Sequence, residues 1–117
     1  EGTSGGNDIK VTWFSEATNL HSIWDTKLIE YQQLSYTEYV AAINHSTLAQ
    51  RKALQKQPLS KWIFDSYTIA QRLHDEIREP NPRLSYRYNF DHIATIEQQL
   101  LAGGIHLAGL LNQIFGN

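Results

Sequence analysis

Residues 19–25 read NLHSIWD, and this stretch determines both the fold that we expect and the candidate site. Its leucine, isoleucine and tryptophan are spaced as on one face of an α-helix, which indicates that this face is buried. His21 and Asp25 lie four residues apart, so a helix brings both side chains to one face. A histidine and a carboxylate next to a buried face need a partner, which can be each other, the solvent or a metal ion.

The His21–Asp25 pair has two interpretations. The two side chains either bind a metal ion together, or they form an ordinary hydrogen-bonded or solvent-exposed pair without a metal ion. Zinc accepts an imidazole nitrogen and a carboxylate oxygen at about 2.0–2.2 Å, which suits two side chains one turn apart. Two ligands do not complete a zinc site, so a third ligand has to come from another segment. The other histidines of the chain form no comparable pair; they are His45, His74, His92 and His106.

The composition is that of one small folded domain. The chain has 117 residues, of which 41% are hydrophobic and 19% charged, and its formal net charge is −2. This slightly negative net charge excludes a protein that binds nucleic acid through excess positive charge alone. Cysteine is absent, so a metal site must use His, Asp, Glu or backbone oxygens. No apolar run approaches the about 20 residues that span a membrane, so no membrane partner is expected.

The first part of the chain combines a glycine-rich loop with one strand. Residues 1–8 are polar and include three glycines, a composition typical of a loop. Residues 9–14, IKVTWF, alternate and are rich in β-branched and aromatic side chains, which indicates a short strand. A single strand needs a partner, which comes either from this chain as a hairpin or from outside it.

The rest of the chain has helical periodicity, and we expect five helices joined mostly antiparallel by short loops. Two of them begin with a capping box, in which Ser or Thr is followed three residues later by Glu or Gln. The sequence therefore predicts an all-α fold with one short N-terminal β-strand or hairpin segment. The expected helix starts, in chain order, are Thr18 or Asn19, Ser35, Thr47, Ser60, and Asn89 or Asp91.

Two glycines interrupt the apolar stripe of the last and longest expected helix. Gly103 and Gly104 lie in its interior, where each glycine costs about 1 kcal/mol relative to alanine. We therefore expect a structural reason for them, which is either the close approach of a neighbouring helix or a local bend.

Three stretches, taken in order, resemble a known family. They are GGNDIKVTWF at 5–14, NLHSIWD at 19–25 and IEQQLLAGGIHLAGLLNQIF at 96–115, and KWIFDSYTIA at 61–70 is also similar. Together they resemble the C-terminal part of the S1/P1 nucleases, which are zinc-dependent, specific for single strands and related to bacterial zinc phospholipase C. The resemblance implies that residues 1–117 are the C-terminal part of one such domain. It further implies the C-terminal helices of the phospholipase C/P1 nuclease fold, with the N-terminal part absent from this chain.

In that family three zinc ions lie in a cleft, and the resemblance implies that His21 and Asp25 ligate one of them. The third protein ligand of that zinc is a histidine upstream of the Gly-Gly-Asn loop, and the remaining ligands also lie upstream. No complete catalytic set is therefore expected in this chain. Asn7 and Gly6 match the loop that helps to hold a nucleobase beside the zinc ions. An Asn amide suits that role because it can both donate to and accept from a base edge.

The chain departs from the family pattern at two places. Glu16 and Ala17 stand where some members carry an aromatic residue that stacks a second base, which argues against that second site. Near the C-terminus the family often has Arg-Leu-Ala, and here the residues are His106, Leu107 and Ala108. The last helix therefore lacks a fixed positive charge.

The resemblance implies zinc-dependent hydrolysis of phosphodiester bonds in single-stranded DNA and RNA, by an endonuclease and 3′-nucleotidase that leaves 5′-phosphate products. The implied partners are a single-stranded nucleic acid or nucleotide and the missing N-terminal part of the enzyme, without which this chain is expected to be inactive. The family also implies a periplasmic or secreted location. Two alternatives remain, a related zinc phospholipase C and a metal-free helical interaction module. Asn7 favours the nuclease over the phospholipase.

Overall fold

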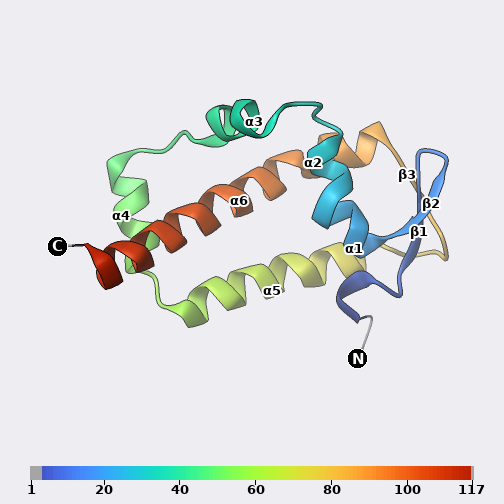
Figure 1. The fold of residues 1–117 in the computed structure, drawn as a ribbon. Coiled ribbons are helices and arrows are strands. Elements are labelled where there is room, and N and C mark those ends of the chain that lie inside the picture. Colours follow the sequence, from blue (N-terminus) through green and yellow to red (C-terminus); the bar gives the residue numbers. More distant parts are fainter. Residues whose placement is uncertain (1–3, 117) are drawn as a thin grey trace.

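The computed structural model describes residues 4–116, and its N-terminal part is a hairpin that joins a three-stranded sheet (Figure 1). Strand β1, Lys10–Trp13, pairs antiparallel with β2, Glu16–Asn19, in a register that places Val11 opposite Thr18. Strand β3, Arg83–Leu84, pairs parallel with the other edge of β1. The predicted strand is therefore confirmed, and both of its partners come from this chain.

Helices make up most of the remaining chain, as predicted. The first helical segment, residues 20–30, consists of α1, Leu20–Ser22, the π-turn η2, Ile23–Lys27, and α2, Leu28–Glu30. Four separate helices follow: α3, Tyr36–Ile43; α4, Leu48–Lys56; α5, Leu59–Asp75; and α6, Tyr86–Phe115. A short 3₁₀ turn, η1, Ser4–Gly6, lies in the expected N-terminal loop. The all-α prediction with an N-terminal hairpin is confirmed.

Local sequence signals predicted some helix starts correctly. Ser35 and Glu38 form a reciprocal capping box at the start of α3, because the Glu38 carboxylate accepts from the Ser35 N–H at 2.9 Å and the Ser35 hydroxyl accepts from the Glu38 N–H at 3.2 Å. Thr47 and Gln50 do the same at the start of α4. Asn19 caps α1 by accepting from the Ser22 N–H at 2.8 Å.

The predicted starts of the last two helices were wrong. Helix α5 begins at Leu59, directly after the extended residue Pro58, so Ser60 lies inside the helix. Helix α6 begins at Tyr86, before the expected Asn89 or Asp91, and the short strand β3 lies just before it. Asn89 lies inside α6 rather than at its start, and its side-chain oxygen accepts from Gln32 Nε2 at 2.8 Å, which ties the turn after the first helical segment to α6.

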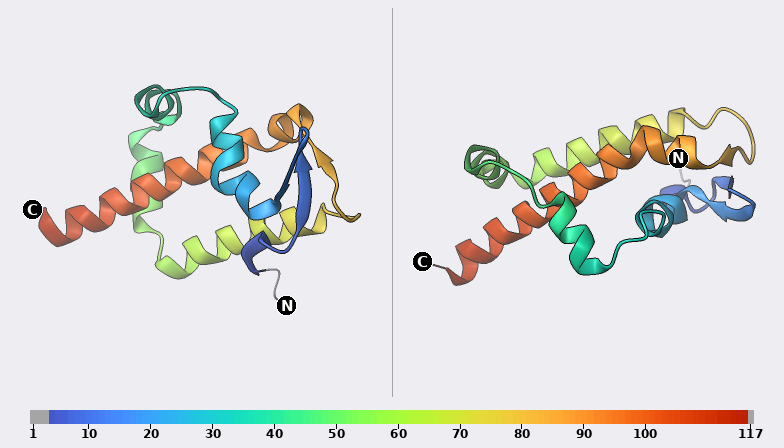
Figure 2. Two further views of the ribbon diagram at one scale, coloured as in Figure 1. Left: turned by 45° about the vertical axis from the view of Figure 1, so that its right-hand side comes forward. Right: turned by 90° about the horizontal axis from the view of Figure 1, so that it is seen from above.

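The buried core lies at the hairpin end of the molecule. It is formed where β1, the first helical segment and the N-terminal half of α6 meet (Figures 1 and 2). The fully buried side chains come from β1 and the first helical segment. Helix α6 adds one aromatic and one β-branched side chain that pack against them. The core residues are Val11, Trp13, Leu20, Ile23, Leu28, Tyr88 and Ile96.

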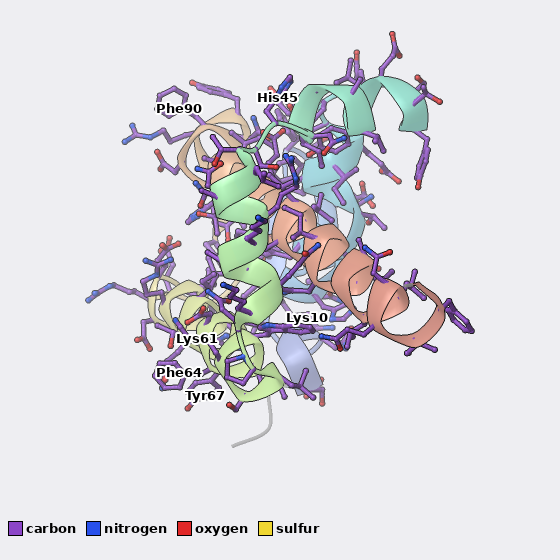
Figure 3. The ribbon with its side chains drawn as sticks, turned by 90° about the vertical axis from the view of Figure 1, so that its left-hand side faces the viewer. Lys10, His45, Lys61, Phe64, Tyr67 and Phe90 are labelled. Carbon is purple, nitrogen blue, oxygen red and sulfur yellow. The ribbon has the colours of Figure 1, made fainter. Side chains whose placement is uncertain are left out.

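The molecule is flat and open toward the C-terminal half of α6. Its principal extents are 51 × 34 × 21 Å, and its radius of gyration is 16.1 Å. A compact chain of this length has a radius of gyration of about 13 Å. Many large apolar side chains on α5 and α6 are consequently exposed, and Figure 3 shows Phe64 and Tyr67 projecting from the outer side of α5. The exposed apolar residues of α5 are Leu59, Ile63, Phe64 and Tyr67.

The two interior glycines of α6 do not contact a neighbouring helix within residues 4–116. No atom of another described element lies within 4 Å of where a Cβ at Gly103 or Gly104 would be. The α-helix also continues without interruption from Tyr86 to Phe115. The prediction of close helix packing at these glycines is therefore wrong for the part of the chain that the structure describes.

Candidate metal centre

The first helical segment presents His21 and Asp25 on its exposed side. Its opposite side buries Leu20, Ile23 and Leu28 in the core, which fixes the rotation of the segment about its axis. His21 and Asp25 both remain exposed to solvent. Of the possible surroundings for this pair, the structure therefore shows exposure to solvent rather than burial in the core.

The π-turn alters how these two side chains are aligned. Ile23–Lys27 form the π-turn, which closes with a hydrogen bond from the Leu28 N–H to the Ile23 carbonyl. In a regular α-helix a residue four positions on is rotated about 40° beyond one full turn. A π-turn needs more residues per turn, so it brings Asp25 more nearly in line with His21. No sequence pattern considered above predicted this turn, although such turns are frequent at functional sites.

The loop before β1 contacts His21 directly. The Nδ1 atom of His21 lies 3.2 Å from the carbonyl oxygen of Gly5. Gly6 is buried against the backbone of His21 and the side chain of Leu20. Leu20 in turn donates its backbone N–H to the carbonyl of Ile9 at 2.9 Å, so the loop, the strand and the helix are joined at this point.

The core side of the segment is anchored to α6 by aromatic residues. The indole N–H of Trp24 donates to the hydroxyl of Tyr88 at 2.9 Å, and the two rings meet edge to face. Burial raises the pKa of the Tyr88 hydroxyl to about 12, so it stays protonated near neutral pH. His92 packs beside both rings and pairs through Nε2 with Glu76 Oε2 at 2.9 Å. The helix that carries His21 and Asp25 is therefore held from behind by a packed network.

The donors present at the pair fit a zinc ion in type but not in number. One imidazole and one carboxylate are the side chains that zinc prefers when cysteine is absent. Within residues 4–116, no group of three or more His, Cys, Asp or Glu side chains is placed to hold a metal ion. A metal ion bound by His21 and Asp25 would therefore need further ligands from outside these residues.

Three other histidines, His45, His74 and His92, lie away from the His21–Asp25 pair. His74 Nδ1 lies 2.7 Å from the carbonyl oxygen of Ala70 in α5. His92 belongs to the network behind Trp24, as described above. His45 is exposed in the connection between α3 and α4 (Figure 3). None of these histidines was predicted to be a ligand.

A cavity lies at the other end of the molecule, between α4, α5 and α6. Its volume is about 820 Å³, and it is lined by both polar and apolar side chains, including Trp62, Asp65 and His106. The rings of Trp62 and His106 stack with centroids 3.7 Å apart. Burial lowers the pKa of His106, so its imidazole is neutral at neutral pH. Trp62 Nε1 and His106 Nε2 have no hydrogen-bond partner among the described residues.

The predicted base-contacting residue, Asn7, lies on the loop beside His21. It is exposed, and one of its two side-chain N–H groups donates to the carbonyl of Ser4 at 2.7 Å, so the amide oxygen and the second N–H are left for other contacts. At the position where some family members carry an aromatic residue, Glu16 forms an ion pair with Lys27 at 3.0 Å. Phe14 and Tyr31 stack nearby, with ring centroids 5.5 Å apart.

The fold and the residues His21 and Asp25 together indicate the class of protein. It is a mainly helical chain in which one exposed helical segment carries part of a candidate metal centre. Within that class, the family model for S1/P1 Nuclease matches residues 1–116. The chain therefore belongs to the S1/P1 nuclease family, as the motifs at 5–14, 19–25 and 96–115 predicted.

The similar proteins include two endonucleases from Arabidopsis thaliana. Endonuclease 3 is 30% identical over 135 residues, which cover 97% of this chain and 44% of that protein. Endonuclease 4 is 29% identical over 137 residues, which cover 99% of this chain and 44% of that protein. The chain thus spans less than half the length of these relatives. Among the described residues, no helix is long and apolar enough to cross a membrane.

Proposed function

We propose that this chain is the C-terminal part of a zinc-dependent nuclease that hydrolyses phosphodiester bonds in single-stranded DNA and RNA. The activity is that of an endonuclease and 3′-nucleotidase that leaves 5′-phosphate products. The observation that carries the proposal is membership of the S1/P1 nuclease family over residues 1–116, and it is supported by His21 and Asp25, which are both exposed and four residues apart in one helical segment. The names of the Arabidopsis relatives, which are endonucleases, support the same class of reaction.

In this proposal His21 and Asp25 hold one of three zinc ions, and the other protein ligands come from the rest of the enzyme. When bound, zinc supplies positive charge to the anionic phosphate and makes water a better nucleophile near neutral pH. The contribution of this chain is to hold an imidazole and a carboxylate on one rigid face. The contact between Trp24 and Tyr88 supports that face, because the hydrogen bond and the ring packing restrain the helix from behind.

The net charge of the chain agrees with a cation-dependent mode of substrate binding. A protein of net charge −2 does not attract phosphates by its side chains alone. Asn7 on the loop beside His21 offers an amide oxygen to a nucleobase, and neighbouring Gly6 lets the backbone lie close to the site. A base that must enter such a site is accessible in a single strand and stacked away in a duplex.

The second partner in the proposal is the rest of the same protein. The relatives are more than twice as long as the matched segment, which covers 44% of Endonuclease 3. The exposed apolar faces of α5 and α6 provide a surface that a further part of the polypeptide would cover. We also infer from the family a periplasmic or secreted location for the whole protein.

The test is an assay of the full-length protein on matched single-stranded and duplex oligonucleotides, before and after removal of metal by EDTA. The proposal expects bound zinc by elemental analysis, faster cleavage of the single strand, 5′-phosphate ends, and phosphate release from 3′-nucleotides. Activity should vanish on chelation and return when zinc is added. Cleavage that persists without metal, or a protein that contains no zinc and cuts neither strand, would overturn the proposal.

A further inference from the structure

Residues 4–8 form a tight loop whose inner side rests on His21. Gly5 and Gly6 both have positive φ values, 65° and 93°, which are conformations that other residues rarely adopt. They turn the chain so that the Gly5 carbonyl oxygen comes within 3.2 Å of His21 Nδ1. The loop therefore reaches the ring through its backbone rather than through a side chain.

This contact determines which ring nitrogen of His21 carries the proton. A carbonyl oxygen can only accept a hydrogen bond, so Nδ1 must be the protonated, donating nitrogen. In the neutral ring the lone pair is then on Nε2, which is the atom left to bind a metal ion. We propose that the loop of residues 4–8 is a positioning element for His21, which fixes its tautomer and ring orientation so that Nε2 is the metal-binding nitrogen. The inference rests on the proposed zinc centre and adds a role for the loop in it.

The packing at Gly6 explains why the loop needs glycine at this position. A Cβ added at Gly6 would lie 3.1 Å from the His21 backbone nitrogen and 3.5 Å from its Cα. Both of these are backbone atoms of a helix that is anchored in the core, so they cannot move aside easily. A side chain at Gly6 would therefore lift the loop and lengthen the contact between Gly5 and His21.

Polar contacts within the loop hold the Gly5 carbonyl in place. Asn7 donates to the Ser4 carbonyl from its backbone N–H at 3.2 Å and from its side-chain N–H at 2.7 Å. The Ser4 hydroxyl donates to Asp8 Oδ2 at 2.9 Å. These bonds make the loop a closed unit before any substrate arrives. Asn7 therefore supports the position of His21 in addition to any contact that it makes with a base.

The first test is the tautomer of His21 in the full-length, metal-free protein, measured from the ¹⁵N chemical shifts of the ring. The His21 signal is assigned by its loss in a His21→Gln variant. The proposal expects the Nδ1–H tautomer, and zinc addition should shift the Nε2 resonance. A ring found as the Nε2–H tautomer before zinc is added would overturn the proposal, whatever the enzyme does.

The second test compares Gly6→Ala with Gly104→Ala in the full-length protein. Each variant adds one methyl group, but the Gly104 methyl meets no atom within 4 Å among the described residues beyond its chain neighbours and the nearby backbone of its own helix. Zinc affinity, measured by competition with a chelating dye, should fall about 10–100-fold in Gly6→Ala, as for other residues that orient a metal ligand. Gly104→Ala should bind zinc as the wild type does. A thermal melt of each variant shows whether it is folded.

The outcomes separate this inference from the proposed function. If His21→Ala loses one zinc ion and folded Gly6→Ala binds zinc like the wild type, the zinc centre stands and the positioning role of the loop is wrong. If His21→Ala keeps all its zinc, the proposed metal centre itself is wrong. If Gly6→Ala does not fold, the tautomer of the wild-type protein still decides the proposal.

Discussion

At the scale of single residues, His21 is the position whose loss should matter most. Replacing His21 by alanine removes one of the two proposed zinc ligands without disturbing the core, because the side chain is exposed to solvent. We expect the full-length His21→Ala variant to lose one zinc ion per molecule and most of its cleavage activity. Elemental analysis and initial rates on a single-stranded oligonucleotide measure both effects. His45→Ala is the control, since His45 is also exposed and belongs to another segment.

Tyr88 gives a second prediction at this scale, on stability and pH. In Tyr88→Phe the indole N–H of Trp24 loses its acceptor, which should lower the free energy of unfolding at neutral pH by about 1–3 kcal/mol. The Tyr88 pKa is raised from 10.0 to about 12 in the folded state. Because the unfolded chain ionises first, this tyrosine makes the wild type less stable as the pH rises from about 10 to 12.

Tyr88→Phe should lack that part of the alkaline loss of stability. Urea unfolding curves at several pH values measure it, and Tyr36→Phe serves as the control because Tyr36 is 86% exposed. Equal alkaline losses in the wild type and in Tyr88→Phe would show that the buried hydroxyl is not responsible.

Individual residues also show how far the sequence could predict the site. The helix that carries His21 and Asp25 followed from the spacing of its apolar residues, because helical periodicity is local information, but the exposure of both side chains had to come from the structure. The contact between Gly5 and His21 spans sixteen residues and depends on two positive φ values, so no periodicity indicates it. The glycine-rich loop was predicted, and what its backbone touches was not.

At the scale of elements, helix starts were predictable where the cap is local. Ser35 and Thr47 satisfy N–H groups three residues on, and both capping boxes are present as predicted. Asn89 was also expected to cap a helix, because Asn is a common capping residue. Its side chain instead accepts from Gln32, which is 57 residues away. The strand at Arg83–Leu84 was missed for a similar reason, since two residues become a strand only through pairing with β1.

Helix α6 gives the prediction at this scale. Gly104 lies in its interior and is exposed, and beyond its chain neighbours and the nearby backbone of α6 no described atom lies within 4 Å of an added Cβ. Gly104→Ala should therefore stabilise the helix by up to about 1 kcal/mol, because alanine loses less backbone entropy than glycine on folding. Thermal unfolding followed by circular dichroism measures the change. Gly6→Ala should instead lower the stability, because its added Cβ would lie 3.1 Å from the His21 backbone nitrogen. A large destabilisation in Gly104→Ala would mean that another part of the protein packs closely at this position.

At the scale of the whole molecule, the number of helices was predictable and their packing was not. Helical periodicity gives the elements one at a time, but it does not give the flat shape with extents of 51 × 34 × 21 Å. That shape places the core at the hairpin end and leaves apolar side chains of α5 and α6 exposed. Such a surface is typical of a chain that is part of a larger folded unit.

The shape and the ligand count lead to one prediction for the 117-residue chain by itself. It should bind zinc weakly and should not cleave single-stranded nucleic acid, because residues 4–116 contain no group of three ligands. The exposed apolar faces should also make it bind a hydrophobic dye such as ANS more strongly than the full-length protein does. Dye fluorescence and a cleavage assay with added zinc measure the two properties. Chelator-sensitive cleavage by the purified chain, at a rate like that of the full-length protein, would contradict the view that the rest of the enzyme completes the metal centre.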